Sequence, residues 1–162
     1  MDLPAQRGPG PYRIAVVCLG NICRSPMAEV VLRAHLERAG LAGEVAVDSS
    51  GTGGWHLGSH MDSRAADTLT EHGYDASRHS AAHFTRARID EHDLVLAMDS
   101  QNLADLRGLG VGDRLRLFRD FDPEGSGDVP DPYYGGTDGF TAVLAMVERT
   151  TDALVSALKG RP

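Results

Sequence analysis

The sequence has few cysteines, no excess of positive charge and no long apolar run. Cysteine occurs only at positions 18 and 23, which excludes a framework of disulfide bonds. There are 16 basic against 23 acidic residues and a net charge of −7, which argues against the basic face of a nucleic-acid-binding protein. The apolar run after Arg13 is too short for a signal peptide or a transmembrane helix. We therefore expect a cytoplasmic protein with no nucleic-acid or membrane partner.

What the chain does have is the composition of an ordinary globular domain. Its 162 residues are 41% hydrophobic and 24% charged, which is enough to bury one core. Residues 1–11 hold three prolines and two glycines and are expected to form a disordered lead-in. Because we find no internal repeat and no second domain, residues 12–162 are expected to form a single domain.

Short apolar runs alternate with amphipathic stretches along this domain. Strands are expected near residues 14–17, 45–48, 94–98 and 115–118, with helices near 26–39, 62–72, 100–106 and 140–158. The segments 49–59 and 120–139 are rich in glycine and polar residues and are expected to be loops. The alternation predicts an α/β fold, a parallel sheet covered by helices on both faces, with its ligand beyond the carboxyl ends of the strands.

The first predicted strand runs directly into a loop with the features of an anion site. Successive backbone N–H groups and a helix N-terminus in such a loop can surround one anion. A thiol beside a helix N-terminus and a guanidinium ionises more readily than a free one and is then a nucleophile. The loop therefore combines a nucleophile with an oxyanion cradle, as phosphoryl transfer through sulfur requires. Its residues are Cys18, Leu19, Gly20, Asn21, Ile22, Cys23, Arg24 and Ser25.

Chemistry alone allows either cysteine of this loop to be the nucleophile, and two small buried apolar residues are the alternative. Cys23 is adjacent to Arg24, whereas five residues separate Cys18 from Arg24. A phosphate held on sulfur needs several backbone amides between the sulfur and the guanidinium that binds its oxygens in two bonds. The spacing therefore favours Cys18 and leaves Cys23 for another role.

A proton donor for the leaving group must come from elsewhere in the chain, because the conjugate acid of a departing phenolate has a pKa of about 10. Asp131 lies between two prolines in the second predicted loop, and loops of that length are usually functional. A simple Asp-Pro turn is the alternative. Tyr133 and Tyr134 favour function, because two adjacent aromatic residues can wall a slot for a planar ring. Trp55 is either the opposite wall of that slot or a plug in the core.

The loop from Cys18 to Pro26 resembles the active-site loop of the low-molecular-weight protein tyrosine phosphatases. The resemblance extends over most of the chain, through the segments 48–49, 97–99 and 131–135. It implies a flavodoxin-like fold of four parallel strands, with the phosphate-binding loop after the first strand. It also implies a chemistry without cofactor or metal, and phosphotyrosine proteins as substrates.

The resemblance gives the catalytic residues their roles. Cys18 would form a cysteinyl phosphate, Arg24 would bind the phosphoryl oxygens, and Ser25 would donate a hydrogen bond to Cys18. Asp131 would protonate the departing phenol and then act as base for the water that breaks the cysteinyl phosphate.

The resemblance also gives roles to residues that support the loop. Asn21 would have the left-handed backbone conformation that asparagine tolerates better than most residues. Ser49 and His79 would hold Asn21 in place. Cys23 would trap oxidised Cys18 as a disulfide, which protects the nucleophile from further oxidation.

Three other functions are compatible with parts of this pattern. An arsenate reductase needs further cysteines downstream, and none follows Cys23. Members of the protein-arginine phosphatase branch typically carry threonine in place of Ile22 and lack the paired tyrosines. A phosphotyrosine-binding module that has lost catalysis would not need the complete set of catalytic residues. We therefore expect a protein tyrosine phosphatase, acting as a monomer or a weak dimer.

Overall fold

A computed structural model describes residues 2–161, which contain a four-stranded parallel sheet. The first strand lies inside the sheet, and six of its seven residues are buried. The order of the strands is β2-β1-β3-β4, which confirms the predicted flavodoxin-like α/β fold. The strands are β1 (Tyr12–Cys18), β2 (Val45–Gly51), β3 (Leu94–Ala97) and β4 (Leu115–Leu117).

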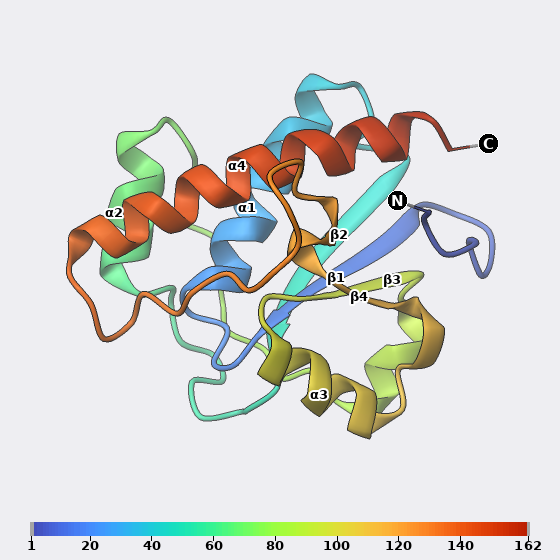
Figure 1. Ribbon diagram of the computed structural model, residues 1–162, viewed down its shortest axis with the longest axis horizontal. Coiled ribbons are helices and arrows are strands. Elements are labelled where there is room, and N and C mark those ends of the chain that lie inside the picture. Colours follow the sequence, from blue (N-terminus) through green and yellow to red (C-terminus); the bar gives the residue numbers. More distant parts are fainter. Residues whose placement is uncertain (1, 162) are drawn as a thin grey trace.

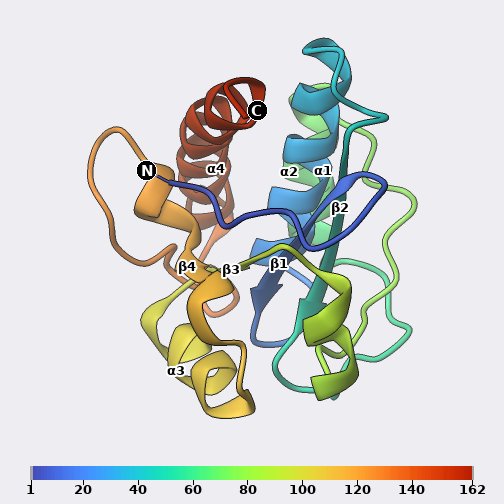
Figure 2. The same cartoon turned by 90° about the vertical axis from the view of Figure 1, so that its right-hand side faces the viewer.

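Helices cover both faces of the sheet, as predicted (Figure 1, Figure 2). Successive residues of a strand point to opposite faces, so Ile14 and Val16 belong to one apolar core while Ala15 and Val17 belong to the other. The first core is covered by α1 (Arg24–Arg38), α2 (Ser63–Glu71) and α4 (Thr137–Lys159), and the second by α3 (Ser100–Leu109) and the 3-10 helix Arg86–Glu91. Two further 3-10 helices span Gly112–Arg114 and Phe118–Phe121.

Three helix boundaries differ from the predicted ones. Helix α1 begins at Arg24 rather than at 26, because proline is tolerated within the first turn, where its missing N–H has no partner to lose. Helix α3 continues past 106 until Gly110, whose φ of 104° ends it. Helix α4 begins at Thr137, three residues before the predicted start. None of these helices, in the part of the chain that the structure describes, is long and apolar enough to cross a membrane.

The segment before β1 contains no helix or strand but makes specific contacts with the rest of the molecule. The Arg7 N–H donates to the Asp93 carboxylate at 2.7 Å, and the Tyr12 hydroxyl donates to the Pro4 carbonyl at 2.8 Å. The Arg7 guanidinium also lies 3.2 Å from the Asp90 carboxylate. The division into a lead-in and a domain stays a prediction.

Candidate active site

The carboxyl end of β1 and the N-terminus of α1 are joined by a loop that curls over a sulfur atom. Cys18 is the last residue of β1, and Arg24 is the first residue of α1. Asn21 has a φ of 58°, the left-handed conformation that the family resemblance implied. This turn directs the Asn21 N–H back to Cys18 Sγ at 3.3 Å, and Ser25 Oγ lies 3.0 Å from the same sulfur. The geometry provides hydrogen-bond donors for a thiolate on Cys18.

The side chain of Asn21 fixes the shape of this loop from behind. Its Oδ1 accepts from the Ala82 N–H at 2.8 Å, which turns its Nδ2 toward two hydroxyl groups. Nδ2 donates to Ser25 Oγ at 2.8 Å and to Ser49 Oγ at 2.9 Å. The His79 Nε2 lies 2.6 Å from the Asn21 carbonyl oxygen. Ser49 and His79 thus both contact Asn21, from segments far away in the sequence.

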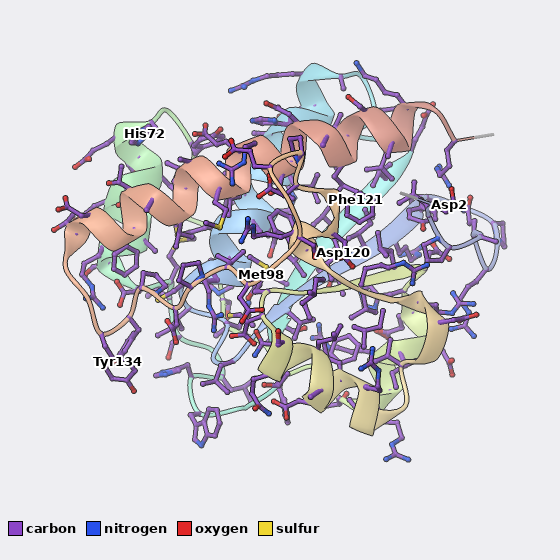
Figure 3. The ribbon with its side chains drawn as sticks, in the orientation of Figure 1. Asp2, His72, Met98, Asp120, Phe121 and Tyr134 are labelled. Carbon is purple, nitrogen blue, oxygen red and sulfur yellow. The ribbon has the colours of Figure 1, made fainter. Side chains whose placement is uncertain are left out.

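A pocket of about 200 Å³ opens above the loop. Loop residues form its floor, and Asp131, Tyr133, Tyr134, Trp55 and His56 form its walls. Trp55 is 73% exposed, which excludes a plug in the core. The ring centroids of the two tyrosines are 5.0 Å apart, edge to face, and Tyr134, with 91% exposure, projects from the loop before α4 (Figure 3).

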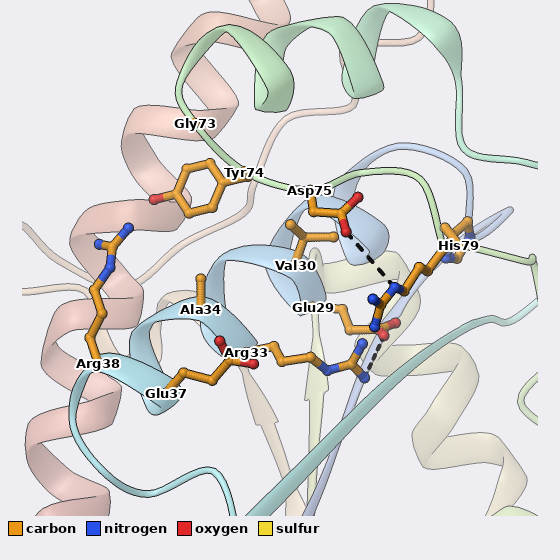
Figure 4. A pocket seen from close by; sticks show the side chains of 11 residues that line it. Glu29, Val30, Arg33, Ala34, Glu37, Arg38, Gly73, Tyr74, Asp75 and His79 are labelled. Atoms are coloured by element: carbon orange, nitrogen blue, oxygen red, sulfur yellow. Dashed lines mark ion pairs between the residues drawn. The ribbon is translucent and has the colours of Figure 1, made fainter.

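A larger cavity of about 380 Å³ lies on the other side of α1, between this helix and the segment 73–79 (Figure 4). Four of its charged side chains form two ion pairs, since Arg33 lies 2.8 Å from Glu29 and Arg78 lies 3.8 Å from Asp75. Neither cysteine lines it. Its size therefore does not make it the site of the chemistry. Within residues 2–161, no group of three or more His, Cys, Asp or Glu side chains is placed to hold a metal ion.

The guanidinium of Arg24 is the buried positive charge of the smaller pocket. It is 3% exposed, and its Nη1 lies 2.5 Å from Asp99 Oδ2 and donates to the Val129 carbonyl at 3.1 Å. Burial works against this charge, but the nearby Cys18 and the hydrogen bond to Asp99 outweigh burial and raise the pKa of Arg24. The group therefore stays charged and oriented by two partners.

Asp99 was not among the site residues that the sequence indicated. Its Oδ1 caps α3 by accepting from the Asn102 N–H at 2.7 Å, while its Oδ2 holds Arg24. The available signal was its position two residues after the end of β3, at the same edge of the sheet as Cys18.

Asp131 reaches the pocket from the long loop between β4 and α4. Its carboxylate lies 3.7 Å from Arg24 Nη2, and its Oδ1 accepts from the Tyr133 N–H at 3.1 Å. The loop is fastened further back, where the buried Asp122 accepts hydrogen bonds from Arg149 and Arg119 at 2.8 and 2.9 Å. The bonds from Arg149, against the cost of burial, hold the pKa of Asp122 well below its usual range.

Cys23 is as buried as Cys18, which is 3% exposed, but the Asn21 N–H and the Ser25 hydroxyl contact the sulfur of Cys18. The Cys23 side chain is 4% exposed, and burial, followed by the charge of Asp62, raises the pKa of the Cys23 thiol to about 12. Both cysteines are free thiols. Cys23 is therefore neutral near pH 7, a poor nucleophile beside the loop.

The family is decided by sequence similarity over nearly the whole chain. The profile of the family described as "Low molecular weight phosphotyrosine protein phosphatase" matches residues 13–161. The chain belongs to this family. A low molecular weight protein-tyrosine-phosphatase from Streptomyces coelicolor is 48% identical over 91% of this chain and 94% of its own length. Low molecular weight protein-tyrosine phosphatase A from Mycobacterium tuberculosis is 43% identical over 89% of this chain and 90% of its own.

Solved structures of low-molecular-weight phosphatases share the fold. YfkJ from Bacillus subtilis superposes with a TM-score of 0.88 at 32% identity, covering 95% of this chain and 98% of that one. A protein tyrosine phosphatase from Entamoeba histolytica, crystallised with Hepes in the active site, gives a TM-score of 0.88 at 31% identity, covering 92% and 97%. The named relatives are protein tyrosine phosphatases, which are hydrolases, and the alternative functions are not favoured.

Gly51, the last residue of β2, is a second residue that the sequence did not single out. A Cβ at this position would lie 2.6 Å from the Leu19 carbonyl oxygen and 3.1 Å from the Asn21 nitrogen. Both atoms belong to the backbone of the phosphate-binding loop, so they cannot move aside without deforming this loop. Only glycine allows the loop to pack this closely on β2.

We expect Gly51→Ala to lower kcat/KM for p-nitrophenyl phosphate by about tenfold, because a small displacement of the loop misplaces its amides around the phosphate. Gly43→Ala is the matched control, since a Cβ at Gly43 has no heavy atom within 4 Å. Steady-state kinetics on both variants measure the effect. Equal kcat/KM values for the two variants would mean that the loop tolerates the added methyl group.

Proposed function

We propose that this protein hydrolyses phosphotyrosine in proteins through a cysteinyl-phosphate intermediate on Cys18, with Asp131 as general acid and then as base. The observation that carries the proposal is the meeting of three groups in one pocket: the Cys18 sulfur, the Arg24 guanidinium and the Asp131 carboxylate. A nucleophile, a fixed positive charge and a partly exposed acid are what transfer of a phosphoryl group from a phenol requires. Family membership supports the substrate class.

In the first step, the Cys18 thiolate attacks phosphorus on the side opposite the phenol oxygen. The sulfur–phosphorus bond forms as the bond to the phenol oxygen breaks, and Asp131 gives its proton to that oxygen. Arg24 and the N–H groups of the loop hold the remaining phosphoryl oxygens. Arg24 and these N–H groups are already oriented toward the negative charge on the phosphoryl oxygens, so they need little reorganisation during the reaction.

In the second step, a water molecule attacks the phosphorus of the cysteinyl phosphate. The Asp131 carboxylate takes a proton from this water, the sulfur–phosphorus bond breaks, and its electron pair returns to Cys18. Ser25 Oγ accepts from the Asn21 amide, so its single proton is free for the thiolate, 3.0 Å away, in place of the Ser50 carbonyl at 3.3 Å. Inorganic phosphate and the ionised thiol are the products.

The walls of the pocket favour an aryl phosphate. Tyr133 and Trp55 offer apolar faces to a planar ring above the loop. A phosphoserine side chain has no ring to fill the space between these walls. The shape of the slot therefore favours phosphotyrosine.

Cys23 supports a redox role for the loop. If peroxide oxidises the Cys18 thiolate to a sulfenic acid, the Cys23 thiol can displace water from that sulfur and form a disulfide, which a thiol reductant reverses. The neutral state of Cys23 keeps it from competing with Cys18 for phosphorus in the reduced enzyme.

Phosphate release from one peptide sequence, prepared with phosphotyrosine, phosphoserine or phosphoarginine, tests the proposal. We expect release from the phosphotyrosine peptide alone. Faster release from the phosphoarginine peptide would mean that the protein is a protein-arginine phosphatase instead. Binding of the phosphotyrosine peptide without any release of phosphate would make the protein a binding module.

A further inference from the structure

The segment 129–136, here called the acid loop, carries Asp131 and both tyrosines but contains no helix or strand. Its first residue is fixed, because the Val129 N–H donates to the Met98 carbonyl at 2.8 Å and the Val129 carbonyl accepts from Arg24. Within residues 2–161, the Asp131 carboxylate has only the long contact to Arg24 and the bond from the Tyr133 N–H. Something else must therefore hold the far half of the acid loop.

Arg64, the second residue of α2, makes those contacts. Its Nη2 donates to the Tyr133 carbonyl at 2.9 Å, and its Nη1 donates to the Gly135 carbonyl at 3.2 Å. The guanidinium carbon also lies 5.5 Å from the centroid of the Tyr133 ring and 4.7 Å from that of Phe140, in the first turn of α4. One planar cation thus contacts both the backbone and the aromatic wall of the acid loop.

Arg64 is in turn held at the phosphate-binding loop. Its Nε and Nη2 donate to the two carboxylate oxygens of Asp62 at 3.1 and 3.0 Å. Burial would raise the pKa of Asp62, but the hydrogen bonds from Arg64 outweigh burial and lower it, so the carboxylate stays ionised. The Asp62 N–H donates to the Ile22 carbonyl at 2.8 Å. A continuous chain of contacts therefore runs from the phosphate-binding loop through Asp62 and Arg64 to Tyr133.

We propose that Arg64 is a positioning residue that sets the place of Asp131 and of the Tyr133 ring above the phosphate-binding loop. This inference rests on the proposed function, because it assigns a purpose to the placing of the acid. The planar, forked guanidinium is needed for this. Its nitrogens bind the Asp62 carboxylate and two carbonyls of the acid loop, while its face lies over the Tyr133 ring. A lysine ammonium is a point charge and cannot do all of this at once.

The Arg64→Lys variant tests the inference through the identity of the leaving group. We expect kcat/KM to fall by about tenfold for phenyl phosphate, whose phenolate needs a proton, and by no more than about twofold for p-nitrophenyl phosphate. Arg78→Lys is the matched control, because the Arg78 side chain is 88% exposed and forms an ion pair with Asp75 at 3.8 Å, away from the acid loop. A merely structural role for Arg64 would lower both rates equally.

A double variant asks whether Arg64 acts through Asp131. If it does, adding Arg64→Lys to Asp131→Asn should leave the dependence on the leaving group unchanged, because the proton donor is already absent. Independent, additive effects of the two substitutions would overturn the inference.

Amide hydrogen exchange of residues 129–136 gives a readout that does not depend on catalysis. Arg64→Lys should speed exchange at Tyr133 and Gly135, while Arg78→Lys should not. If the wild type hydrolyses aryl phosphates but exchange in Arg64→Lys is unchanged, the role of Arg64 alone is refuted. If exchange in Arg64→Lys is faster but the wild type hydrolyses no aryl phosphate, the role of Arg64 is supported and the proposed function is refuted.

Discussion

The Cys18→Ser variant is expected to fold and to release no measurable phosphate from p-nitrophenyl phosphate. A serine hydroxyl stays protonated where a thiol can ionise, so it needs a base to activate it. The groups bonded to the Cys18 sulfur are the Asn21 N–H, which only donates, and the neutral Ser25 hydroxyl, and neither of them is a base. We expect a loss of at least about 10⁴-fold in kcat, the scale seen when a nucleophile is removed.

The measurement is phosphate release together with the binding of a phosphotyrosine peptide to the same variant. The oxyanion cradle is made of backbone groups and Arg24, which the substitution leaves in place, so peptide binding should survive while turnover does not. Cys23→Ser serves as the matched thiol-to-hydroxyl control. Because Cys23 is buried and neutral, that variant should keep much of its activity. Turnover retained by Cys18→Ser would remove the assignment of the nucleophile.

The sequence predicted those parts of the molecule whose signals are local. Strand β1 is read from an apolar run and helix α1 from an amphipathic stretch, and both lie where they were expected to within a few residues. The order of apolar and amphipathic segments was enough to predict the sheet and the helices on both faces. The preference for Cys18 over Cys23 also rests on a count of residues, because the number of amides in a loop is a local property, and it stays a prediction.

The contacts that complete the site could not be read in this way, because they join segments that only the fold brings together. Asp99 meets Arg24 across the sheet, and nothing in a helix-capping pattern indicates a second partner. Gly51 was one glycine among 19 until its distance to the Leu19 carbonyl was known. Trp55 was ambiguous for a similar reason, since exposure depends on what packs around a loop. Distance and burial, rather than residue type, decided these cases.

Two carboxylates lie near Arg24, and their surroundings separate their roles. Asp99 is 20% exposed, lies 2.5 Å from the guanidinium and caps α3 with its other oxygen. Both of its oxygens are engaged as hydrogen-bond acceptors, and it is not among the residues that line the pocket. Asp131 is 38% exposed and 3.7 Å from the same guanidinium. Of the two, Asp131 is the one that lines the pocket.

Asp131→Asn is therefore expected to lower kcat/KM for phenyl phosphate by about 10²-fold, and that for p-nitrophenyl phosphate much less. An asparagine amide keeps the size of the side chain but cannot give its proton to a departing phenolate. Since kcat/KM covers only the steps up to the departure of the phenol, it isolates the acid role from the later attack of water. The measurement is a series of aryl phosphates of increasing leaving-group pKa.

Asp138→Asn is the matched control, because Asp138 is an exposed acid in the first turn of α4, and the substitution removes the same charge from the same segment. Loss of charge alone would affect the two variants alike and every leaving group alike. Loss of the acid makes the slope of log kcat/KM against leaving-group pKa steeper in Asp131→Asn only. Equal losses for acidic and weakly acidic phenols would show that Asp131 binds substrate without protonating it, and the proton would then have to come from water at the mouth of the pocket.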